Sequence, residues 1–256
     1  MSDFGHRIGA ALVLGASGGL GGACARMLLE RGSDVALTYF RSPSSLDGLL
    51  TAAAETGRRA RTWQLDLSDA DLTAEVVAQA AAEFGGLHTL VYAAGPHVPM
   101  RHLSKVAPAD FRGQILDDVS GFFNAVHAVL PHLRECKGSI VAITTAGTAR
   151  FPVRDGLSIA PKGAVEALVR GIAAEEGRFG VRANSVGPGM TTDGMADRLI
   201  KSGDLDRQAL EVTKNNIPLR RFGDAQDIAE AVCFLASDRA DFISGQKLDV
   251  DGGYGV

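Results

Sequence analysis

The sequence contains few cysteines, and their arrangement suggests neither a disulfide nor a metal site. Cys24, Cys136 and Cys233 are scattered over 256 residues, each in an apolar helical or helix-end context, with no C-x-x-C spacing. An odd number of dispersed thiols does not indicate a disulfide framework. We therefore expect reduced thiols in the core or at the surface, and no metal site.

The sequence also lacks runs of one charge and long apolar segments. The formal net charge is −4, and lysine and arginine form no cluster. This excludes the usual electrostatic signature of a protein that binds nucleic acid or an anionic membrane surface. No apolar run is long enough to span a bilayer, and the first fifteen residues do not resemble an export signal. We expect a soluble, cytoplasmic protein.

Linker-like and low-complexity stretches are missing as well. With 46% hydrophobic residues, the chain has enough apolar material for one substantial core. We expect residues 1–256 to form a single domain.

Short apolar runs alternate with segments of helical period. The runs lie at 8–14, 34–40, 58–65, 87–94, 138–144, 181–187 and 246–250. Strands that are apolar on both faces are typical of a parallel sheet covered by helices. Between them, segments such as 19–32, 69–85 and 162–180 repeat apolar residues three and four apart and end near glycine. The pattern predicts an α/β fold with a doubly wound, seven-stranded parallel sheet.

Capping residues and one long irregular stretch refine this outline. Ser68, three residues before Asp71, and Asp224, three residues before Asp227, are predicted helix N-caps. The stretch from Pro188 to about Asn216 shows no clear period. Since a loop of this length in a compact domain usually serves binding, we expect it to border a substrate site.

A glycine-rich turn follows the first predicted strand. Gly15, Gly19 and Gly21 have the spacing G-x-x-x-G-x-G and open the first predicted helix. Glycines let a backbone approach a pyrophosphate closely, and free N–H groups at a helix start attract its charge. A turn without a ligand has the same composition, but the position after the first strand favours a dinucleotide site.

This spacing resembles that of the short-chain dehydrogenase/reductase family, and the similarity continues along nearly the whole chain. Further matching motifs are LDLSD at 65–69, AAG at 93–95, VRANSVGPG at 181–189 and ISGQKLDVDGG at 243–253. The resemblance implies a Rossmann-type fold, a nicotinamide dinucleotide cofactor and oxidoreductase activity on a small molecule. It also implies cofactor contacts from Gly15, Ser17, Gly19, Leu20, Gly21, Asp66, Leu67, Ala93, Ala94, Gly95, Lys162, Pro188, Gly189 and Thr191.

The end of the second predicted strand favours one form of the cofactor. An acidic residue there would accept the ribose hydroxyls of NAD, but this sequence has Arg41 and Ser42 instead. A guanidinium beside a hydroxyl suits a 2′-phosphate, although a solvated arginine is common in such loops. We expect NADP(H).

Four family side chains converge on the nicotinamide, and three of them differ here. The resemblance assigns the positions of asparagine, serine, tyrosine and lysine to Asp118, Thr145, Ser158 and Lys162. Lys162 is expected to hold the nicotinamide ribose and to bring positive charge near the reacting carbonyl. Thr145 keeps a hydroxyl that can orient a substrate oxygen, with Thr144 as the adjacent alternative.

Ser158 cannot replace a tyrosine as an acid. A phenol has a pKa near ~10, within reach of tuning by a nearby lysine, whereas an alkanol stays protonated and only donates a hydrogen bond. Ser158 is equally suited to starting the helix, since Pro161 lacks an N–H and is expected in its first turn.

Two further polar residues have two interpretations each. Asp118 either feeds protons to the site or forms a solvated pair with Asp117, and the solvated pair is favoured. Tyr92 falls at a family asparagine position near the cofactor, but an aromatic residue that simply ends a strand is favoured.

Serine in place of tyrosine also resembles the 2,4-dienoyl-CoA reductases, although their substitute upstream acid corresponds to Gly147. Enoyl reductases with a tyrosine seven residues before the lysine have Asp155 there. Reducing a C=C conjugated to a thioester needs only a hydrogen-bond donor that stabilises an enolate. We therefore expect reduction of the activated C=C of an enoyl thioester-like substrate. The alternatives are a ketoreductase or alcohol dehydrogenase that recruits Asp118 or water, and an NADP-binding protein without turnover.

Apolar stripes in 122–133 and 165–176 correspond to the helices through which family members mostly form tetramers. The resemblance therefore implies a homotetramer.

Overall fold

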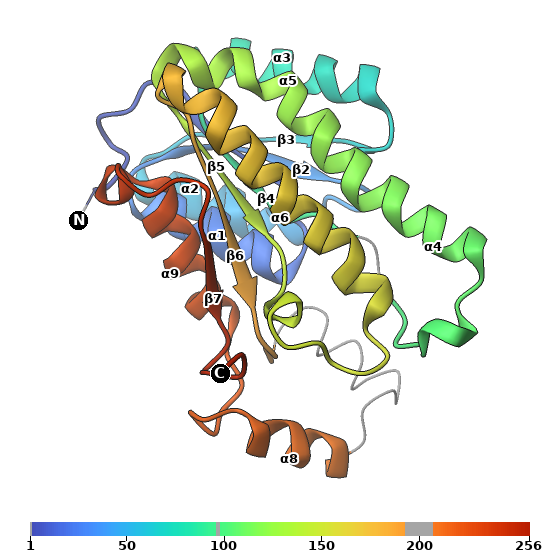
Figure 1. Cartoon of the computed structure of the whole chain (residues 1–256). Coiled ribbons are helices and arrows are strands. Elements are labelled where there is room, and N and C mark those ends of the chain that lie inside the picture. Colours follow the sequence, from blue (N-terminus) through green and yellow to red (C-terminus); the bar gives the residue numbers. More distant parts are fainter. Residues whose placement is uncertain (1, 96–97, 193–206) are drawn as a thin grey trace.

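A parallel sheet of seven strands forms the centre of the molecule (Figure 1). The computed structural model describes residues 2–95, 98–192 and 207–256. The strands are β1 (Ala10–Leu14), β2 (Asp34–Tyr39), β3 (Ala60–Gln64), β4 (Leu87–Tyr92), β5 (Ser139–Ile143), β6 (Arg182–Pro188) and β7 (Lys247–Val250). Their order is β3-β2-β1-β4-β5-β6-β7, which confirms the predicted sheet. The winding reverses between β1 and β4, the place where such sheets bind ligands at their carboxyl edge.

Helices cover both faces of the sheet (Figure 1). One layer contains α1 (Gly19–Glu30), α2 (Asp47–Thr56) and α9 (Ala225–Ala236), and the other contains α3 (Ala70–Phe84), α5 (Gly121–Cys136) and α6 (Gly156–Glu176). Every residue of β1, β4 and β5 is buried, because both faces of these strands are covered. The result is a single doubly wound α/β domain with one core on each side of the sheet.

Two further helices belong to the described part of the chain. Helix α4 (Pro108–Ile115) leads into α5 through a π-helical turn at Leu116–Ser120, and α8 (Arg207–Asn216) lies beyond the carboxyl edge of the sheet (Figure 1). The expected irregular stretch therefore ends earlier than predicted, because α8 occupies its last ten residues. Residues 193–206 of that stretch lie outside the described part of the chain.

One of the two predicted N-caps is wrong. Helix α3 is capped by Asp69, whose side chain accepts a hydrogen bond from the N–H of Leu72 at 2.9 Å. Ser68 instead donates its hydroxyl to Asp66 Oδ1 at 2.7 Å, so it stabilises the turn before the helix. The prediction for Asp224 is confirmed, since Asp224 and Asp227 form a reciprocal capping box at the start of α9.

The start of α6 also differs from the prediction. The helix begins at Gly156, so Pro161 lies beyond the first turn and Ser158 is inside the helix, not its cap. Proline here costs one helical hydrogen bond. Leu157, Ile159 and Pro161 are all buried, and we attribute the early start to this packing.

The cysteines and the helix lengths can be compared with the sequence expectations in the part of the chain that the structure describes. Cys24 and Cys233 are buried free thiols and Cys136 is an exposed one, in agreement with the prediction. Of the helices that the structure describes, none combines the length and apolarity needed to cross a membrane.

Candidate active site

The glycine turn is held tightly between β1 and β4. Gly15 has φ +78°, and a Cβ there would lie 2.8 Å from Ala94 Cα. A Cβ on Gly21 would lie 2.3 Å from the carbonyl oxygen of Gly15. Thr38 orders the turn from β2, since its hydroxyl accepts the N–H of Gly15 at 3.3 Å and its carbonyl accepts the N–H of Ala16 at 3.0 Å. Glycine is required at both positions by close backbone approach.

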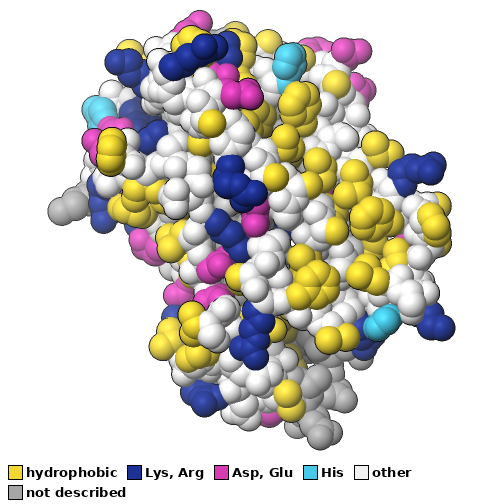
Figure 2. Space-filling model, in the orientation of Figure 1, with side chains coloured by type: hydrophobic (Ala, Val, Ile, Leu, Met, Phe, Trp, Pro, Cys, Tyr) yellow, Lys and Arg dark blue, Asp and Glu magenta, His cyan; other side chains and the backbone are white. Residues whose placement is uncertain are grey.

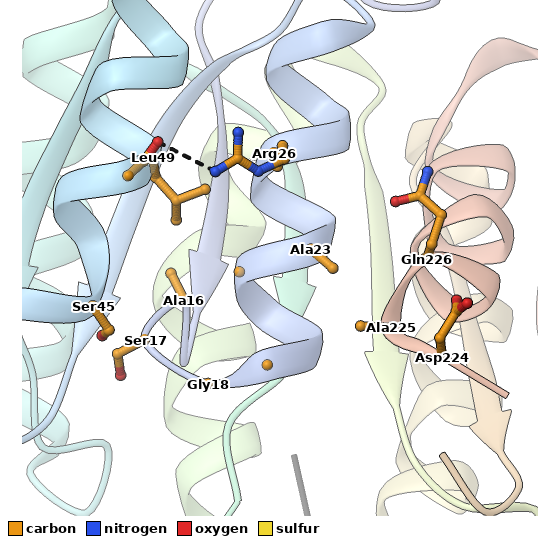
Figure 3. Close-up of a pocket in the computed structure, with 13 residues that line it drawn as sticks. Ala16, Ser17, Gly18, Ala23, Arg26, Ser45, Leu49, Asp224, Ala225 and Gln226 are labelled. Carbon is orange, nitrogen blue, oxygen red and sulfur yellow. Dashed lines mark hydrogen bonds between the residues drawn. The ribbon is translucent and has the colours of Figure 1, made fainter. Parts of the chain in front are cut away.

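No side chain caps the start of α1, where Gly18 is the N-cap. The free N–H groups of this first turn can therefore bind a phosphate. A cavity of about 500 Å³ lies beside the turn, lined by residues of α1, α2 and the start of α9 (Figure 3). Ser17 and Ser45 both line it, and Ser45 was not recognised from the sequence. The turn has the room and the donors that a dinucleotide pyrophosphate needs.

The turn after β3 is anchored to α5. Asp66 Oδ1 accepts the N–H of Ser68 at 3.0 Å, and Asn124 Nδ2 donates to the carbonyl of Leu67 at 2.9 Å. Asp66 Oδ2 has no hydrogen bond to a described residue, so it is available to a ligand. Asn124 is a second residue that sequence reasoning missed, because its role depends on a contact with residues 57 positions away.

Arg41 is exposed at the end of β2. Its guanidinium carbon lies 5.5 Å from the centre of the Phe40 ring, and the carbonyl of Phe40 is held by Gln64 Nε2 at 3.0 Å. The guanidinium is therefore supported by an aromatic face and remains accessible to an anion. Ser42 follows it and is also exposed.

The ends of β4 and β6 bring the remaining expected cofactor residues to the same edge. Lys162 Nζ donates to the carbonyl of Ala94 at 3.4 Å, and a Cβ on Gly95 would lie 3.4 Å from Nζ. Gly189 donates its N–H to Val250 at 3.0 Å, and Thr191 forms an isolated bridge with Gly223. Ala93 and Pro188 are half-buried beside them.

A buried triangle joins Lys162 to Asp118 and Tyr92. Lys162 Nζ lies 2.9 Å from Asp118 Oδ1, and the Tyr92 hydroxyl donates to the same residue, at 3.0 Å to its carbonyl and 3.3 Å to Oδ1. Asp118 is 3% exposed, whereas Asp117 is exposed. The favoured interpretation of a solvated pair is therefore wrong for Asp118. The π-helical turn at Leu116–Ser120 contains Asp118, and this local geometry leaves no signal in residue spacing.

Tyr92 keeps its proton in this arrangement. Burial raises the pKa of the Tyr92 phenol well above its usual value, and the Asp118 charge raises it further. The phenol donates a hydrogen bond to Asp118, and its raised pKa makes it a weaker acid than a free tyrosine. The prediction of an aromatic residue that ends a strand is confirmed, since Tyr92 is the last residue of β4. It is also fully buried, and its hydroxyl has a polar role.

Thr144 and Thr145 differ in burial, as expected for neighbouring residues at the end of a strand, where side chains alternate in direction. Thr144 is buried and donates to the carbonyl of Val186 at 3.3 Å. Thr145 is half-buried, and its hydroxyl oxygen accepts the N–H of Gly147 at 3.1 Å, which leaves its proton free to donate. Ser158 is half-buried in the first turn of α6, and its hydroxyl makes no hydrogen bond to a described residue.

Asp155 precedes Ser158 by one turn. Burial raises the pKa of its carboxyl from 3.8 to about 6, and the side chain does not cap α6. No feature of the residue pattern predicted this environment.

Comparison with known proteins identifies the family. A family model described as enoyl-(acyl carrier protein) reductase matches residues 15–255. The 3-oxoacyl-[acyl-carrier-protein] reductase FabG of Staphylococcus epidermidis is 33% identical, over 95% of this chain and 97% of that protein. The chain belongs to the short-chain dehydrogenase/reductase family. It is an oxidoreductase-type domain, as the sequence motifs implied.

Solved structures agree with this assignment. A short-chain dehydrogenase from Burkholderia cenocepacia in complex with NADP is 30% identical, has a TM-score of 0.87 and covers 97% of this chain and 98% of its own. Carveol dehydrogenase from Mycobacterium avium in complex with NAD is 26% identical, with a TM-score of 0.90 and 99% of each chain covered. The similar structures therefore include both forms of the cofactor.

Proposed function

We propose that this protein is an NADP(H)-dependent reductase of carbonyl compounds, with a 3-oxoacyl thioester as the first candidate substrate. The observation that carries the proposal is that Lys162 contacts Ala94 after β4, while Thr145 follows β5 and Ser158 lies in the first turn of α6, all toward the carboxyl edge of the sheet. Both hydroxyls have a proton to donate. The name of FabG supports the substrate class, since that relative reduces a 3-oxoacyl group.

The preference for NADP(H) rests on the end of β2. Arg41 and Ser42 would hold the 2′-phosphate, with Ser17 at the adjacent turn. The pyrophosphate would lie against Gly19, Leu20 and Gly21, whose N–H groups begin α1. The adenine would contact Asp66 and Leu67, and the nicotinamide half would contact Ala93 to Gly95, Pro188, Gly189 and Thr191.

When bound, reduced nicotinamide supplies a hydride to the substrate carbon. The protein must then stabilise the negative charge that develops on the substrate oxygen, and Thr145 and Ser158 donate hydrogen bonds for this purpose. Lys162 adds positive charge. Two of its three N–H donors face Asp118 and the Ala94 carbonyl, so one remains for the ribose or the substrate side.

The proton source is the point at which this site departs from its family. We propose that Ser158 stands where relatives have a tyrosine, so that no phenol of suitable pKa delivers a proton. Water supplies it instead, either directly or through the remaining Lys162 donor. Asp118 does not fit this role, because its carboxylate accepts hydrogen bonds from both Lys162 and the Tyr92 hydroxyl. Carbonyl reduction by the native protein is then expected to be slow relative to an enzyme with a phenol.

A second candidate is reduction of a C=C conjugated to an acyl thioester. The absence of a phenol favours it, because an enolate needs hydrogen-bond donors and its carbon can take a proton from water later. The description of the matching family model also names an enoyl reductase. The third alternative, cofactor binding without turnover, predicts no product from either class.

One experiment separates these functions. The protein is incubated with NADPH and either 3-oxoacyl or 2-enoyl thioesters of matched chain length, and products are identified by mass spectrometry. A 3-hydroxyacyl product supports the main proposal, and a saturated acyl product from the enoyl substrate supports the second. Binding of NADPH without either product would leave only the binding protein.

We also propose a homotetramer. Phe123 on α5 is 54% exposed and Leu116 before it is 52% exposed, and hydrophobic side chains gather over α4 and α5 on this face (Figure 2). Apolar surface of this kind favours association. Light scattering that gives the mass of a monomer at micromolar concentration would contradict it.

A further inference from the structure

A half-buried charged cluster lies next to Thr145, in residues to which sequence reasoning assigned no function. It consists of Thr148, Glu166, Lys247 and Asp249, hereafter the Lys247 cluster. Lys247 Nζ contacts Thr148 Oγ1, lies 2.9 Å from Asp249 Oδ1 and lies 3.5 Å from Glu166 Oε1. Glu166 is 8% exposed. The cluster therefore joins three elements: the short 3-10 turn at Ala146–Thr148, α6 and β7.

The charges of the cluster depend on Lys247. Two carboxylates face one ammonium, and Asp249 Oδ1 has no hydrogen-bond partner although it is within ion-pair distance of Lys247. Asp249 Oδ1 is close enough to Lys247 Nζ for charge attraction, which acts without the alignment that a hydrogen bond requires. Removing Lys247 would leave two carboxylates, one of them buried, without their counter-ion.

Gly187 of β6 provides the space for this cluster. Its φ is not in the left-handed region, so glycine is not required there by backbone conformation. A Cβ on Gly187 would lie 2.1 Å from Asp249 Oδ1, 2.7 Å from Lys247 Cε and 3.1 Å from the carbonyl carbon of Thr145. The cluster and the backbone of Thr145 therefore share one tightly filled space.

The cluster also connects Thr145 with α6, the helix that carries Lys162. The Thr148 hydroxyl lies 3.2 Å from the carbonyl of Thr145 and 3.0 Å from Glu166 Oε1, and its single proton can serve either. Glu166 follows Lys162 by four residues, so both lie on one side of α6. The path from Thr145 to the helix that carries Lys162 runs through Thr148 and Glu166, and Lys247 holds both.

We propose that Lys247 is a positioning residue that fixes Thr145 relative to Lys162, acting through Thr148 and Glu166. The inference rests on the proposed function, because its main effect is on reductase turnover. Lys247 does not touch the substrate or cofactor in this account. It sets the distance between a hydroxyl donor and a cation on separate elements, to which catalysis is sensitive.

The test replaces Lys247 with methionine, which keeps the length of the side chain and removes the charge. We expect kcat to fall about 10- to 100-fold, as misplacement of a reacting group does, while the Kd of NADPH changes by less than about twofold. The matched control is Lys105→Met, since Lys105 is exposed and outside the cluster. Its kcat should equal that of the native protein.

A second-site change provides the rescue. In the double variant Lys247→Met/Glu166→Gln, one carboxylate is removed and the new amide can donate to Thr148 Oγ1. The double variant should recover most of the lost kcat. If Lys247→Met does not fold, Thr148→Val removes the link without stranding a charge and should lower kcat with unchanged NADPH affinity. Failure of the rescue, or an unchanged kcat in Thr148→Val, would overturn the proposal.

Hydrogen exchange separates this inference from the proposed function. In the protein without substrate, amides of residues 145–149 should exchange faster in Lys247→Met than in Lys105→Met, and amides of β4 should be unchanged. Unchanged exchange at 145–149 would refute the positioning role. If no thioester is reduced by the native protein, the proposed function fails, but the exchange measurement still decides whether Lys247 orders the turn.

Discussion

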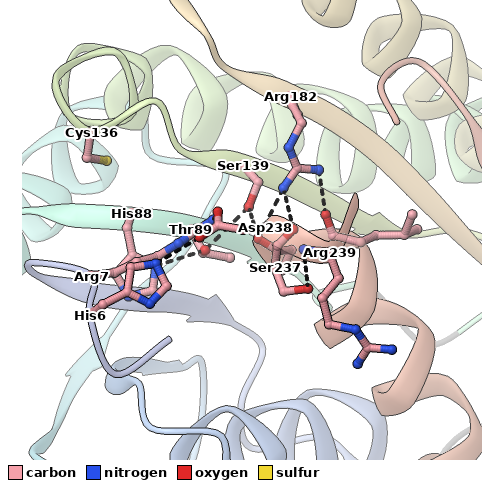
Figure 4. A network of polar contacts seen from close by, with 12 residues as sticks. His6, Arg7, His88, Thr89, Cys136, Ser139, Arg182, Ser237, Asp238 and Arg239 are labelled. Carbon is pink, nitrogen blue, oxygen red and sulfur yellow. Dashed lines mark hydrogen bonds and ion pairs between the residues drawn. The ribbon is translucent and has the colours of Figure 1, made fainter. Parts of the chain in front are cut away.

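The two edges of the sheet use polar residues in different ways. At the amino edge, polar groups from distant segments bond mainly to one another (Figure 4). Arg182 donates to the carbonyls of Leu235 at 2.7 Å and Ser237 at 2.9 Å, at the carboxyl end of α9. At the carboxyl edge, the hydroxyls of Ser158 and Thr145 and one oxygen of Asp66 keep hydrogen-bonding capacity for a ligand. At the amino edge these polar groups bond to one another, whereas the carboxyl edge keeps donors and acceptors that we propose serve a ligand.

His88 illustrates the completed edge. It is buried, with Nε2 at 3.2 Å from Ser33 Oγ and Nδ1 at 3.0 Å from Thr89 Oγ1. Burial, followed by the charge of Arg7, lowers the pKa of its imidazole from 6.5 to about 3. A neutral histidine between two hydroxyls stabilises the fold and offers no acid–base chemistry near neutral pH. Side-chain networks at this edge should therefore affect stability and leave ligand binding unchanged.

The largest expected effect comes from breaking the amino edge at Arg182. Arg182→Met would leave the carbonyl of Leu235 without a donor and would remove one of two donors from the carbonyls of Ala236 and Ser237. Because several charge-assisted hydrogen bonds are lost, we expect the free energy of unfolding to fall by about 3–4 kcal/mol. NADPH affinity, measured by fluorescence titration of the folded variant, should be unchanged. The control is Arg170→Met on the exposed side of α6. A large loss of NADPH affinity in Arg182→Met would show that the two edges are not independent.

Acid should weaken the same edge through His88. The pKa of His88 is depressed in the folded state, so between pH 6.5 and 3 the unfolded state binds a proton that the folded state does not. The contribution of His88 to stability is therefore full above pH 6.5 and is lost as the pH falls toward 3. Between pH 7.5 and 4.5 this contributes a loss of about 3 kcal/mol. Urea unfolding of native protein and His88→Gln at both pH values isolates the contribution. An identical pH dependence for the two proteins would contradict it.

The carboxyl edge should show the opposite dependence at Asp155. Its pKa is raised to about 6, so its contribution is favourable when protonated at low pH and is lost as the pH rises through 6. Asp155→Asn should therefore stabilise the protein at pH 7.5 by up to about 3 kcal/mol, and by little at pH 4. Thermal unfolding at the two pH values tests this, and an equal gain at both would show that burial of charge is not the cause.

The smallest expected effect concerns the choice of cofactor. If Arg41 pairs with the 2′-phosphate, Arg41→Ala should weaken NADPH binding by roughly 1.5–3 kcal/mol, about 10- to 100-fold, and leave NADH binding unchanged. Isothermal titration with both cofactors measures the preference directly. Equal affinity of the native protein for NADPH and NADH would remove the basis for this prediction.

The sequence predicted the frame of the molecule better than the contacts within the site. All seven strands were predicted. The central strands β1, β4 and β5 are buried on both faces and leave continuous apolar runs, whereas the edge strands β3 and β7 are only partly buried. Glycines required by close approach mark the turn after β1. Thr38 is a polar residue within an otherwise apolar strand. This feature could have indicated its role in ordering the glycine turn, but it was not recognised from the sequence.

Features that depend on tertiary packing were predicted poorly. The start of α6 was misplaced because buried Leu157 and Ile159 extend the helix ahead of Pro161. Asp118 was expected in water because the adjacent Asp117 suggested a polar helix face, whereas a π-helical turn separates their environments. Neither the ion pair with Lys162 nor the Lys247 cluster follows from local spacing, since each joins residues far apart in the chain.

The proposed reductase site has hydrogen-bond donors for a carbonyl oxygen but no phenol acid at the position of Ser158. The direct measurement is the rate of NADPH oxidation with a 3-oxoacyl thioester by the native protein and by Ser158→Tyr. Both proteins are measured with and without the additional change Lys162→Ala. We expect Ser158→Tyr to raise the rate by about tenfold or more, because general acid catalysis typically contributes at least that much, and Lys162→Ala to abolish the gain. A fast native reaction that Ser158→Tyr slows would contradict the claim, since the proton would then come from another group already in place.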